Sequence, residues 1–217
     1  MHKPNNLLEH DVKEELNWDP MLDDSRVQVQ ADSGKVVLTG TVPTYYDSSL
    51  AFEDAWSVGG VKDVDNELLV GPIGEALTDA DLALACVDAL DRDSMVPKGS
   101  VIASVDDGWV TLTGQVRHHF QRQAAVHAVS RLSGVLGVTD EVTISSDPIP
   151  SDVVDRINKA FDRNAIIEPS LITVSNEGHT IYLDGAVGSW AARSEAVDTA
   201  WGAPGVTDVV DRLVIAD

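Results

Sequence analysis

Three glycines, spaced at the length of a small domain, constrain the fold of this chain more than any other feature. Each one ends a short apolar run, Gly40 in VVLTGTV, Gly114 in VTLTGQV and Gly185 in IYLDGAV. In every copy an alanine follows the glycine by 11 residues and a Gly-Val pair ends at 21 residues. The three anchor glycines are 74 and 71 residues apart, which is too long for a solenoid unit. The sequence therefore predicts three tandem domains.

The domain boundaries are set by turn-rich segments between the copies. The segments near 71–75 (GPIGE) and 145–150 (SSDPIP) combine Gly, Pro, Ser and Asp, which are typical of linkers. We therefore predict domains at residues 1–72, 75–146 and 149–217.

Each copy begins with an amphipathic helix. In the second copy Leu82, Cys86 and Leu90 fall on one helical face, and Thr78 is suited to cap the helix. Ser151 is the predicted cap in the third copy, and Pro20 limits the helix of the first.

A β-hairpin, a second helix and a last strand complete the copy. The predicted hairpin turns are 32–34, 106–108 and 176–178, which contain Gly with Asp, Ser, Asn or Glu. The strand–helix–strand crossover after the turn requires those two strands to be parallel. We predict an α+β fold, in which each domain has the order α-β-β-α-β, a three-stranded mixed sheet with both helices on one face, and one open sheet face.

The charge of the chain restricts its partners. It carries 15 Lys and Arg against 36 Asp and Glu, for a net charge of −21. Such a field repels phosphate backbones and anionic lipid at long range. We therefore expect no nucleic-acid partner, and any lipid or anion contact has to be local.

Several features of the chain bear on its compartment. The N-terminus lacks an apolar signal region, no window approaches a membrane span, and Cys86 alone excludes an internal disulfide. We expect a cytoplasmic protein.

The repeated motif resembles the BON domain. That family is named for bacterial osmotic-shock-induced periplasmic and nodulation-associated proteins. The likeness rests on a hairpin strand ending in LTG-x-V, an alanine-bearing helix, and a tail of the form GV-x-x-V-x-(N/D). The tail runs through three sets of residues, Gly60, Val61, Val64 and Asn66, then Gly134, Val135, Val138 and Asp140, then Gly205, Val206, Val209 and Asp211.

The resemblance implies a non-enzymatic binding module that contacts phospholipid and serves envelope or osmotic stress responses. Some family members resemble potassium sensors, in which a BON domain is joined to a peptidoglycan-binding module. From the residues of this chain we expect neither the secretory signal nor that second kind of module.

No motif for catalysis is present, so we expect no enzyme, no cofactor and no metal. Cys86 lies on an apolar helix stripe, where a packed thiol is favoured over a nucleophile. The repeated Asn66, Asp140 and Asp211 are expected to hydrogen-bond local backbone, because one polar residue per copy is far short of a cation site.

The second copy alone has a basic, aromatic-tipped turn after its anchor glycine. Its candidate headgroup-contact residues are Arg117, His118, His119, Phe120 and Arg122. One interpretation is docking on a phospholipid headgroup or another anionic partner, aided by helix N-terminal amides. The other is a solvated helix start with Phe120 packed inside, which the sequence favours. The adjacent histidines point to different sides, so a metal is not predicted.

The open sheet faces are the other candidate surface. Strand alternation turns Val110 and Leu112 toward the helices, and therefore turns Trp109 outward. Val37 and Tyr182 hold the corresponding outward side of the other two copies. Packing between neighbouring repeats is the first interpretation, and self-association or a ligand groove comes next.

These observations predict a non-catalytic binding or adaptor protein in a stress response. Its leading ligand class is membrane phospholipid or another anionic surface, reached through the second domain. A protein–protein scaffold or self-associating module is the first alternative, and a potassium-responsive switch is the second.

Overall fold

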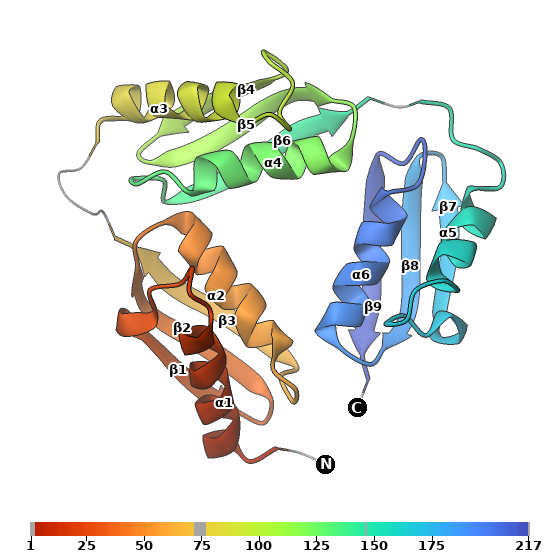
Figure 1. The fold of residues 1–217 in the computed structure, drawn as a ribbon, viewed down its shortest axis with the longest axis horizontal. Helices are drawn as coiled ribbons and strands as arrows, with labels where there is room; N and C mark the ends of the chain where they lie inside the picture. The colour runs from red at the N-terminus through yellow and green to blue at the C-terminus, as the bar shows by residue number, and fades with distance from the viewer. Residues whose placement is uncertain (1–2, 72–76, 146, 217) are drawn as a thin grey trace. The chain divides into compact units, whose positions relative to one another are not determined.

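The computed structural model describes residues 3–71, 77–145 and 147–216. Within these ranges the helices and strands form three copies of one arrangement (Figure 1). The first copy consists of α1 (Asn5–Trp18), β1 (Val27–Asp32), β2 (Lys35–Val42), α2 (Tyr45–Ser57) and β3 (Asp63–Val70). The second consists of α3 (Asp79–Arg92), β4 (Val101–Asp106), β5 (Trp109–Val116), α4 (His119–Ser130) and β6 (Gly137–Ile144). The third consists of α5 (Val153–Phe161), β7 (Ile172–Glu177), β8 (Thr180–Val187), α6 (Trp190–Trp201) and β9 (Asp208–Ile215).

Each sheet has three strands, in the orders β1-β2-β3, β4-β5-β6 and β7-β8-β9. In the first sheet β1 and β2 are antiparallel, with Val27 opposite Gly40, and β2 and β3 are parallel, with Lys35 opposite Asp63. The third sheet repeats this register. In each copy two helices cover one face of the sheet (Figure 1). The predicted α+β fold class, three small mixed-sheet domains in tandem, is therefore confirmed.

The apolar residues that recur with helical or strand periodicity in the sequence form the three cores. The first helices bury one stripe each, Leu8, Val12 and Leu16, then Leu82, Cys86 and Leu90, then Val153, Ile157 and Phe161. The middle strands bury Val36 and Leu38, Val110 and Leu112, and Ile181 and Leu183. The second helices face the sheets mainly with alanines, such as Ala51, Ala125 and Ala196, which allow close packing.

The anchor glycines are required by backbone geometry. Gly40, Gly114 and Gly185 have φ of 118°, 132° and 130°. A Cβ on any of them would lie 2.0 to 2.1 Å from a backbone carbonyl oxygen just before the neighbouring strand. The repeated glycine therefore serves a structural purpose, because every other residue would clash there.

Two local predictions fail at turns. Thr78 caps α3 as expected, by accepting the Asp81 N–H, but Ser151 lies in a turn outside α5 and Asp152 holds the cap position. The third hairpin turn is also shifted by one residue. Glu177 pairs with Thr180, so Gly178 and His179 form the turn, where the first hairpin uses Ser33 and Gly34.

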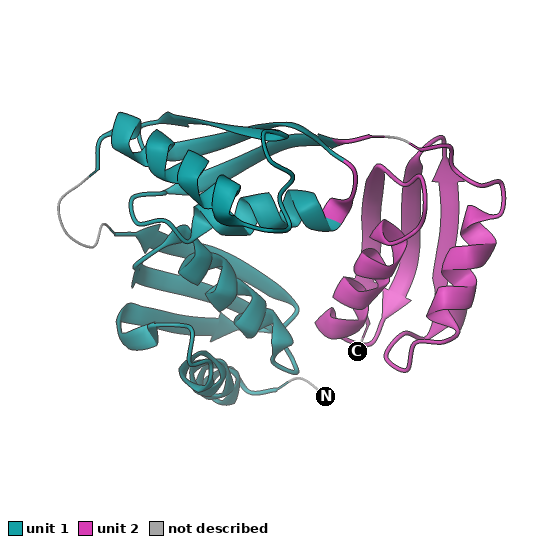
Figure 2. Cartoon of the chain, turned by 45° about the horizontal axis from the view of Figure 1, so that its top comes forward, with its two compact units in different colours: residues 1–116, 120–143 teal, residues 117–119, 144–217 magenta. Residues whose placement is uncertain are grey.

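The chain divides into two compact units (Figure 2). Unit 1 contains residues 1–116 and 120–143, and unit 2 contains 117–119 and 144–217. Most of the predicted linker at 71–75 and residue 146 of the second linker lie outside the described residues. Among the helices that are described, none is long and apolar enough to cross a membrane.

Candidate functional site

Arg122 of the predicted headgroup turn is held by a structural ion pair. Its Nε lies 2.5 Å from Oδ2 of Asp140, and Oδ1 of Asp140 accepts the Val142 N–H at 3.0 Å. The third domain repeats this arrangement with Arg193, Asp211 and Leu213 at 2.7 and 2.8 Å. This link between the second helix and the last strand of a domain, which we call the helix–strand strut, is present in both domains. The ion pair of Arg122 is therefore not specific to the second domain.

The first domain fills the same positions without charge. Asn66 Nδ2 donates to the carbonyl and hydroxyl oxygens of Ser48 at 2.9 and 3.0 Å, and Asn66 Oδ1 accepts the Leu68 N–H at 3.2 Å. In all three domains, then, the repeated Asn or Asp accepts the backbone N–H two residues ahead. The prediction that these side chains hydrogen-bond local backbone is confirmed.

The rest of the predicted headgroup turn is divided between the two compact units. In unit 2 the Arg117 and His118 side chains are exposed, with Arg117 Nη2 3.7 Å from Asp147 Oδ2. The half-buried His119 ring is stacked on Trp201, with 3.9 Å between centroids. In unit 1 Phe120 is 51% exposed. The role of these residues in binding a headgroup stays a prediction.

The outward sheet positions are occupied as strand alternation predicts. Trp109 is 56% exposed, while its neighbour Val110 is fully buried. The Trp109 ring also covers Gly137 of β6, where an added Cβ would come within 2.3 Å of the ring. Trp109 therefore supplies the cover that a side chain on Gly137 would otherwise give.

The corresponding outward positions of the other domains expose less apolar area. Val37 and Tyr182 are both half-buried, and the Arg212 guanidinium lies 5.0 Å from the Tyr182 ring centroid. Their use as an interface stays a prediction.

Sequence reasoning missed an exposed apolar face on the first helix of the second domain. Ala80, Leu84 and Val87 follow one another at i, i+4 and i+7 on the outer side of α3, and we call them the α3 stripe. Leu84 is 69% exposed and Val87 is 49% exposed.

The other two domains show that this face is not needed for the fold. Counted from the anchor glycines, the positions of Leu84 and Val87 hold His10 and Lys13 in the first domain. In the third domain they hold Asp155 and Asn158. Comparing the three copies position by position would have revealed the α3 stripe, because it is apolar in one copy alone.

A groove of about 280 Å³ continues the α3 stripe toward the edge strand β4. Val87 and Leu90 line it from the helix, and Val101 and Ile102 line it from the strand. Ile102 is 66% exposed, so the apolar surface extends across the groove to the open sheet face. The charged residue among those lining the groove is Asp91.

The flanks of the α3 stripe are acidic. The helix carries Asp79, Asp81, Asp88 and Asp91 against one basic residue, Arg92. Arg92 is already paired with Asp88, at 3.2 Å between Nη2 and Oδ2. Asp79 is also engaged, because its carboxylate accepts the N–H groups of Asp107 and Gly108. The stripe is therefore an apolar surface with a negative margin.

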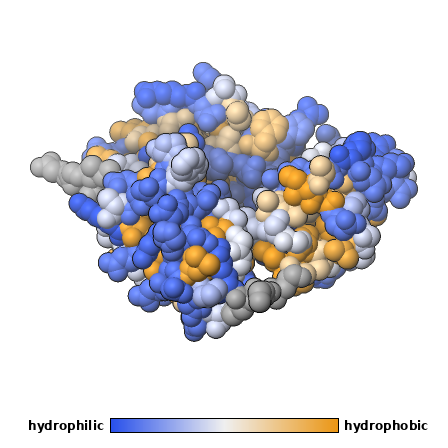
Figure 3. All heavy atoms as spheres, turned by 60° about the horizontal axis from the view of Figure 1, so that its bottom comes forward, coloured by the Kyte–Doolittle hydropathy of each residue, from blue (hydrophilic) through white to orange (hydrophobic). Residues whose placement is uncertain are grey.

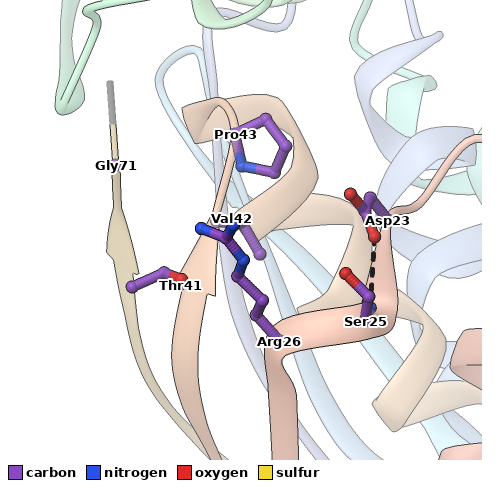
Figure 4. A pocket seen from close by; sticks show the side chains of 7 residues that line it. All are labelled: Asp23, Ser25, Arg26, Thr41, Val42, Pro43 and Gly71. Atoms are coloured by element: carbon purple, nitrogen blue, oxygen red, sulfur yellow. Dashed lines mark hydrogen bonds between the residues drawn. The ribbon is translucent and has the colours of Figure 1, made fainter. Parts of the chain in front are cut away.

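A second hollow, of about 310 Å³, lies at the anchor-glycine end of the first domain (Figure 4). Its lining includes Asp23, Arg26 and Pro43. The Asp23 carboxylate accepts the Ser25 N–H at 3.2 Å, and hydrogen bonding from Ser25 lowers the Asp23 pKa. Because this carboxylate serves a local turn, the polar groups do not converge on a ligand position.

Metal and thiol chemistry find no support in the part of the chain that the structure describes. Within it, no three His, Cys, Asp or Glu side chains are grouped to hold a metal ion. Cys86 is buried, and burial raises the pKa of its thiol to about 11, so the thiol stays protonated near neutral pH.

One face of the molecule is mostly hydrophilic with separate apolar patches. Figure 3 shows this face, on which hydrophilic residues predominate and hydrophobic residues gather in a few places between them. This matches the net charge of −21 and the limited number of exposed large apolar side chains.

The repeated fold and its glycine-anchored hairpins define a tandem small-domain protein. The BON domain family model matches residues 5–72, 78–146 and 151–217. These matches cover most of the chain, so it belongs to the BON domain family and contains three copies of the domain. None of the matches indicates an enzyme family.

Individual relatives are more distant. A 21 kDa hemolysin of Actinobacillus pleuropneumoniae is 30% identical over 133 residues, which span 59% of this chain and 68% of the hemolysin. Two solved structures of a structural protein of the type III secretion system of Chlamydia trachomatis are each 15% identical and cover 97% of this chain. They are covered over 92% and 98% of their own length, with TM-scores of 0.27 and 0.26. Scores this low support no statement about function.

Proposed function

We propose that this chain is a non-catalytic adaptor, active in a stress response, that docks a protein partner through its second BON domain. The observation that carries the proposal is the distribution of exposed apolar side chains. Eight of the fifteen exposed large apolar side chains among the described residues fall in the second domain and its leading edge. They are Leu77, Leu84, Val87, Met95, Ile102, Trp109, Phe120 and Leu136.

Charge singles out the same domain. Formal net charges are −9 for residues 1–74, −5 for 75–146 and −7 for 147–217. Concentrated exposed apolar surface on a soluble fold marks interaction sites, since water disfavours leaving it open. The second domain combines the largest share of that surface with the least negative formal charge.

The proposal is tested by site-specific photo-crosslinking in cells that make the full chain. A photoreactive phenylalanine analogue is placed at Leu84, and matched controls carry it at His10 and Asp155, the same position in the other domains. We expect a discrete protein adduct from position 84 and none from the controls. The same adduct pattern from all three positions, or no protein adduct from position 84, would contradict the proposal.

Contact with a phospholipid or another anionic surface is the second candidate function. Two observations favour it, the exposed cationic side chain of Arg117 beside the exposed His118, and a relative that is named a hemolysin. If it holds, the full chain floats with anionic vesicles but not with zwitterionic ones, and Arg117→Glu abolishes flotation. Equal behaviour of the variant and the unaltered chain removes this candidate.

A further inference from the structure

We infer that the partner segment is an amphipathic helix with basic flanks that lies along the α3 stripe and inserts an apolar side chain into the α3–β4 groove. This inference rests on the proposed adaptor function and names its partner by chemistry. It follows from the shape, the length and the charge of one surface.

The shape of the surface suits a helix. Ala80, Leu84 and Val87 present a ridge along α3, and the groove beside it runs between that helix and β4. Ridges of one helix pack into grooves of another, and helix-in-groove binding is a common mode of peptide recognition. At about 1.5 Å of rise per residue, α3 offers roughly 20 Å of contact length, about four turns of a partner helix.

The groove supplies an anchor position. Val87, Leu90, Val101 and Ile102 line it with aliphatic surface. Binding energy in interfaces concentrates where a few apolar side chains enter such pockets. A Leu, Met or Phe of the partner is the kind of side chain that fits a hollow of about 280 Å³ with this lining.

The negative charge beside the α3 stripe determines which charge the partner should carry. Asp81 and Asp88 lie along one side of the α3 stripe, and Asp91 follows Val87 by one turn. Arg92 pairs with Asp88, and these three aspartates and one arginine together keep a formal charge of −2. Lys or Arg on the flanks of the partner helix would complement this margin and raise the association rate. A second copy of the chain would set the same acidic margin against itself, and an anionic membrane would meet repulsion as well.

The test uses a synthetic amphipathic helical peptide of about five turns as the probe. It has leucines on one face and lysines on both flanks, and a matched peptide has glutamates in place of the lysines. Fluorescence anisotropy with the full chain is expected to give saturable binding of the lysine peptide. The glutamate peptide should bind at least about tenfold more weakly, and added salt should reduce that difference.

Variants of the chain locate the site. Leu84→Ser with Val87→Ser is expected to weaken binding of the lysine peptide by about tenfold or more. Met21→Ser removes an apolar side chain of comparable exposure from the first domain and should change nothing. Asp88→Lys with Asp91→Lys should reverse the preference and favour the glutamate peptide.

Three outcomes would overturn the inference. The first is equal binding of the two peptides, and the second is binding that ignores the changes at Leu84 and Val87. The third is that Leu84→Ser abolishes flotation with anionic vesicles or abolishes a dimer seen by light scattering, which would assign the surface to a membrane or to a second copy. If position 84 still crosslinks a protein while the peptides fail to discriminate, the adaptor function stands and the basic helix is wrong.

Discussion

Asp54 on α2 is a carboxyl group in an unfavourable place. Its Oδ2 is buried and has no hydrogen-bond partner in the described structure. Burial, followed by the negative charges of Asp19, Glu15 and Glu53, raises the pKa of Asp54 from 3.8 to about 7. The folded first domain therefore holds this proton more tightly than the unfolded chain does.

The raised pKa of Asp54 predicts how stability depends on pH. Because the folded pKa exceeds the unfolded one, the stabilising effect of the bound proton is complete below about pH 4 and is lost as pH rises through about 7. Asp54→Asn should make the free energy of unfolding depend less on pH and should stabilise the first domain at pH 8 by ~1 kcal/mol. This value is smaller than the pKa shift alone would give, because the carboxyl group is partly exposed to solvent. Thermal denaturation from pH 5 to 8 measures it.

A smaller loss of stability with rising pH should remain in the Asp54→Asn variant. Burial and the charge of Glu195 also raise the pKa of Asp198 in the third domain. An Asp54→Asn protein that loses stability with rising pH as steeply as the unaltered chain would contradict the assignment.

The anchor glycine of the second domain gives a prediction at the same scale. Gly114→Ala would place a Cβ 2.1 Å from the Ser100 carbonyl oxygen at a φ of 132°. We expect it to destabilise the domain by more than about 3 kcal/mol, since both strain and a clash act. Gly99→Ala is the matched control, because Gly99 also has a positive φ but open space around its Cβ position.

Chemical denaturation of these two glycine variants separates clash from strain. Gly99→Ala should cost about 1–2 kcal/mol, which is the penalty for left-handed backbone alone. Equal losses from the two substitutions would show that the close approach to Ser100 is unimportant.

At the scale of elements, one helix–strand strut recurs in two chemical forms. The second and third domains use Arg and Asp, as in Arg122 with Asp140, and the first uses Ser48 with Asn66. The side chains of Arg122 and Asp140 are 28% and 21% exposed, so this pair is better shielded than a surface ion pair. Each form ties a second helix to the last strand of its sheet.

The two forms of the strut predict a compensating exchange. Arg122→Ser alone leaves Asp140 with one partner fewer and should cost about 1–2 kcal/mol. Adding Asp140→Asn recreates the pair of the first domain, so the double variant should recover part of that loss. A double-mutant cycle by denaturation measures the coupling. Losses that simply add would mean that the two residues act independently.

The helices and strands were predictable from the sequence because the three copies show the same apolar periodicity independently. The stripe of Leu82, Cys86 and Leu90 and the inward Val110 and Leu112 are where the periodicity placed them. Ser151 failed as a cap because Asp152, directly before Val153, suits the position as well, and local backbone decides between the two.

The candidate site was harder to predict, for a physical reason. The pairing of Arg122 with Asp140 joins residues 18 apart, and it depends on the helix packing over the last strand. Exposure of Leu84 and Val87 likewise depends on which side of α3 meets the sheet. The periodicity of α3 places Leu82, Cys86 and Leu90 against the sheet. Only the polar residues at the positions of Leu84 and Val87 in the other copies show that the fold does not need apolar side chains there.

At the scale of the whole molecule, charge dominates. All three domains are acidic and the chain carries −21 in all. Self-repulsion of this kind disfavours the compact state, and salt relieves it by screening over a Debye length of about 10 Å at 0.1 M. The unfolded chain, being more expanded, gains less from the same screening.

Salt therefore distinguishes an acidic adaptor from a potassium-responsive switch. For the adaptor, potassium chloride and sodium chloride at equal ionic strength should raise Tm equally, because screening depends on ionic strength and not on which of the two cations is present. A potassium switch would show an added rise with potassium alone, which saturates as a binding site fills. Differential scanning fluorimetry with both salts, over the same range of ionic strength, measures the difference. A saturable excess with potassium would restore the switch and identify a cation site that screening cannot explain.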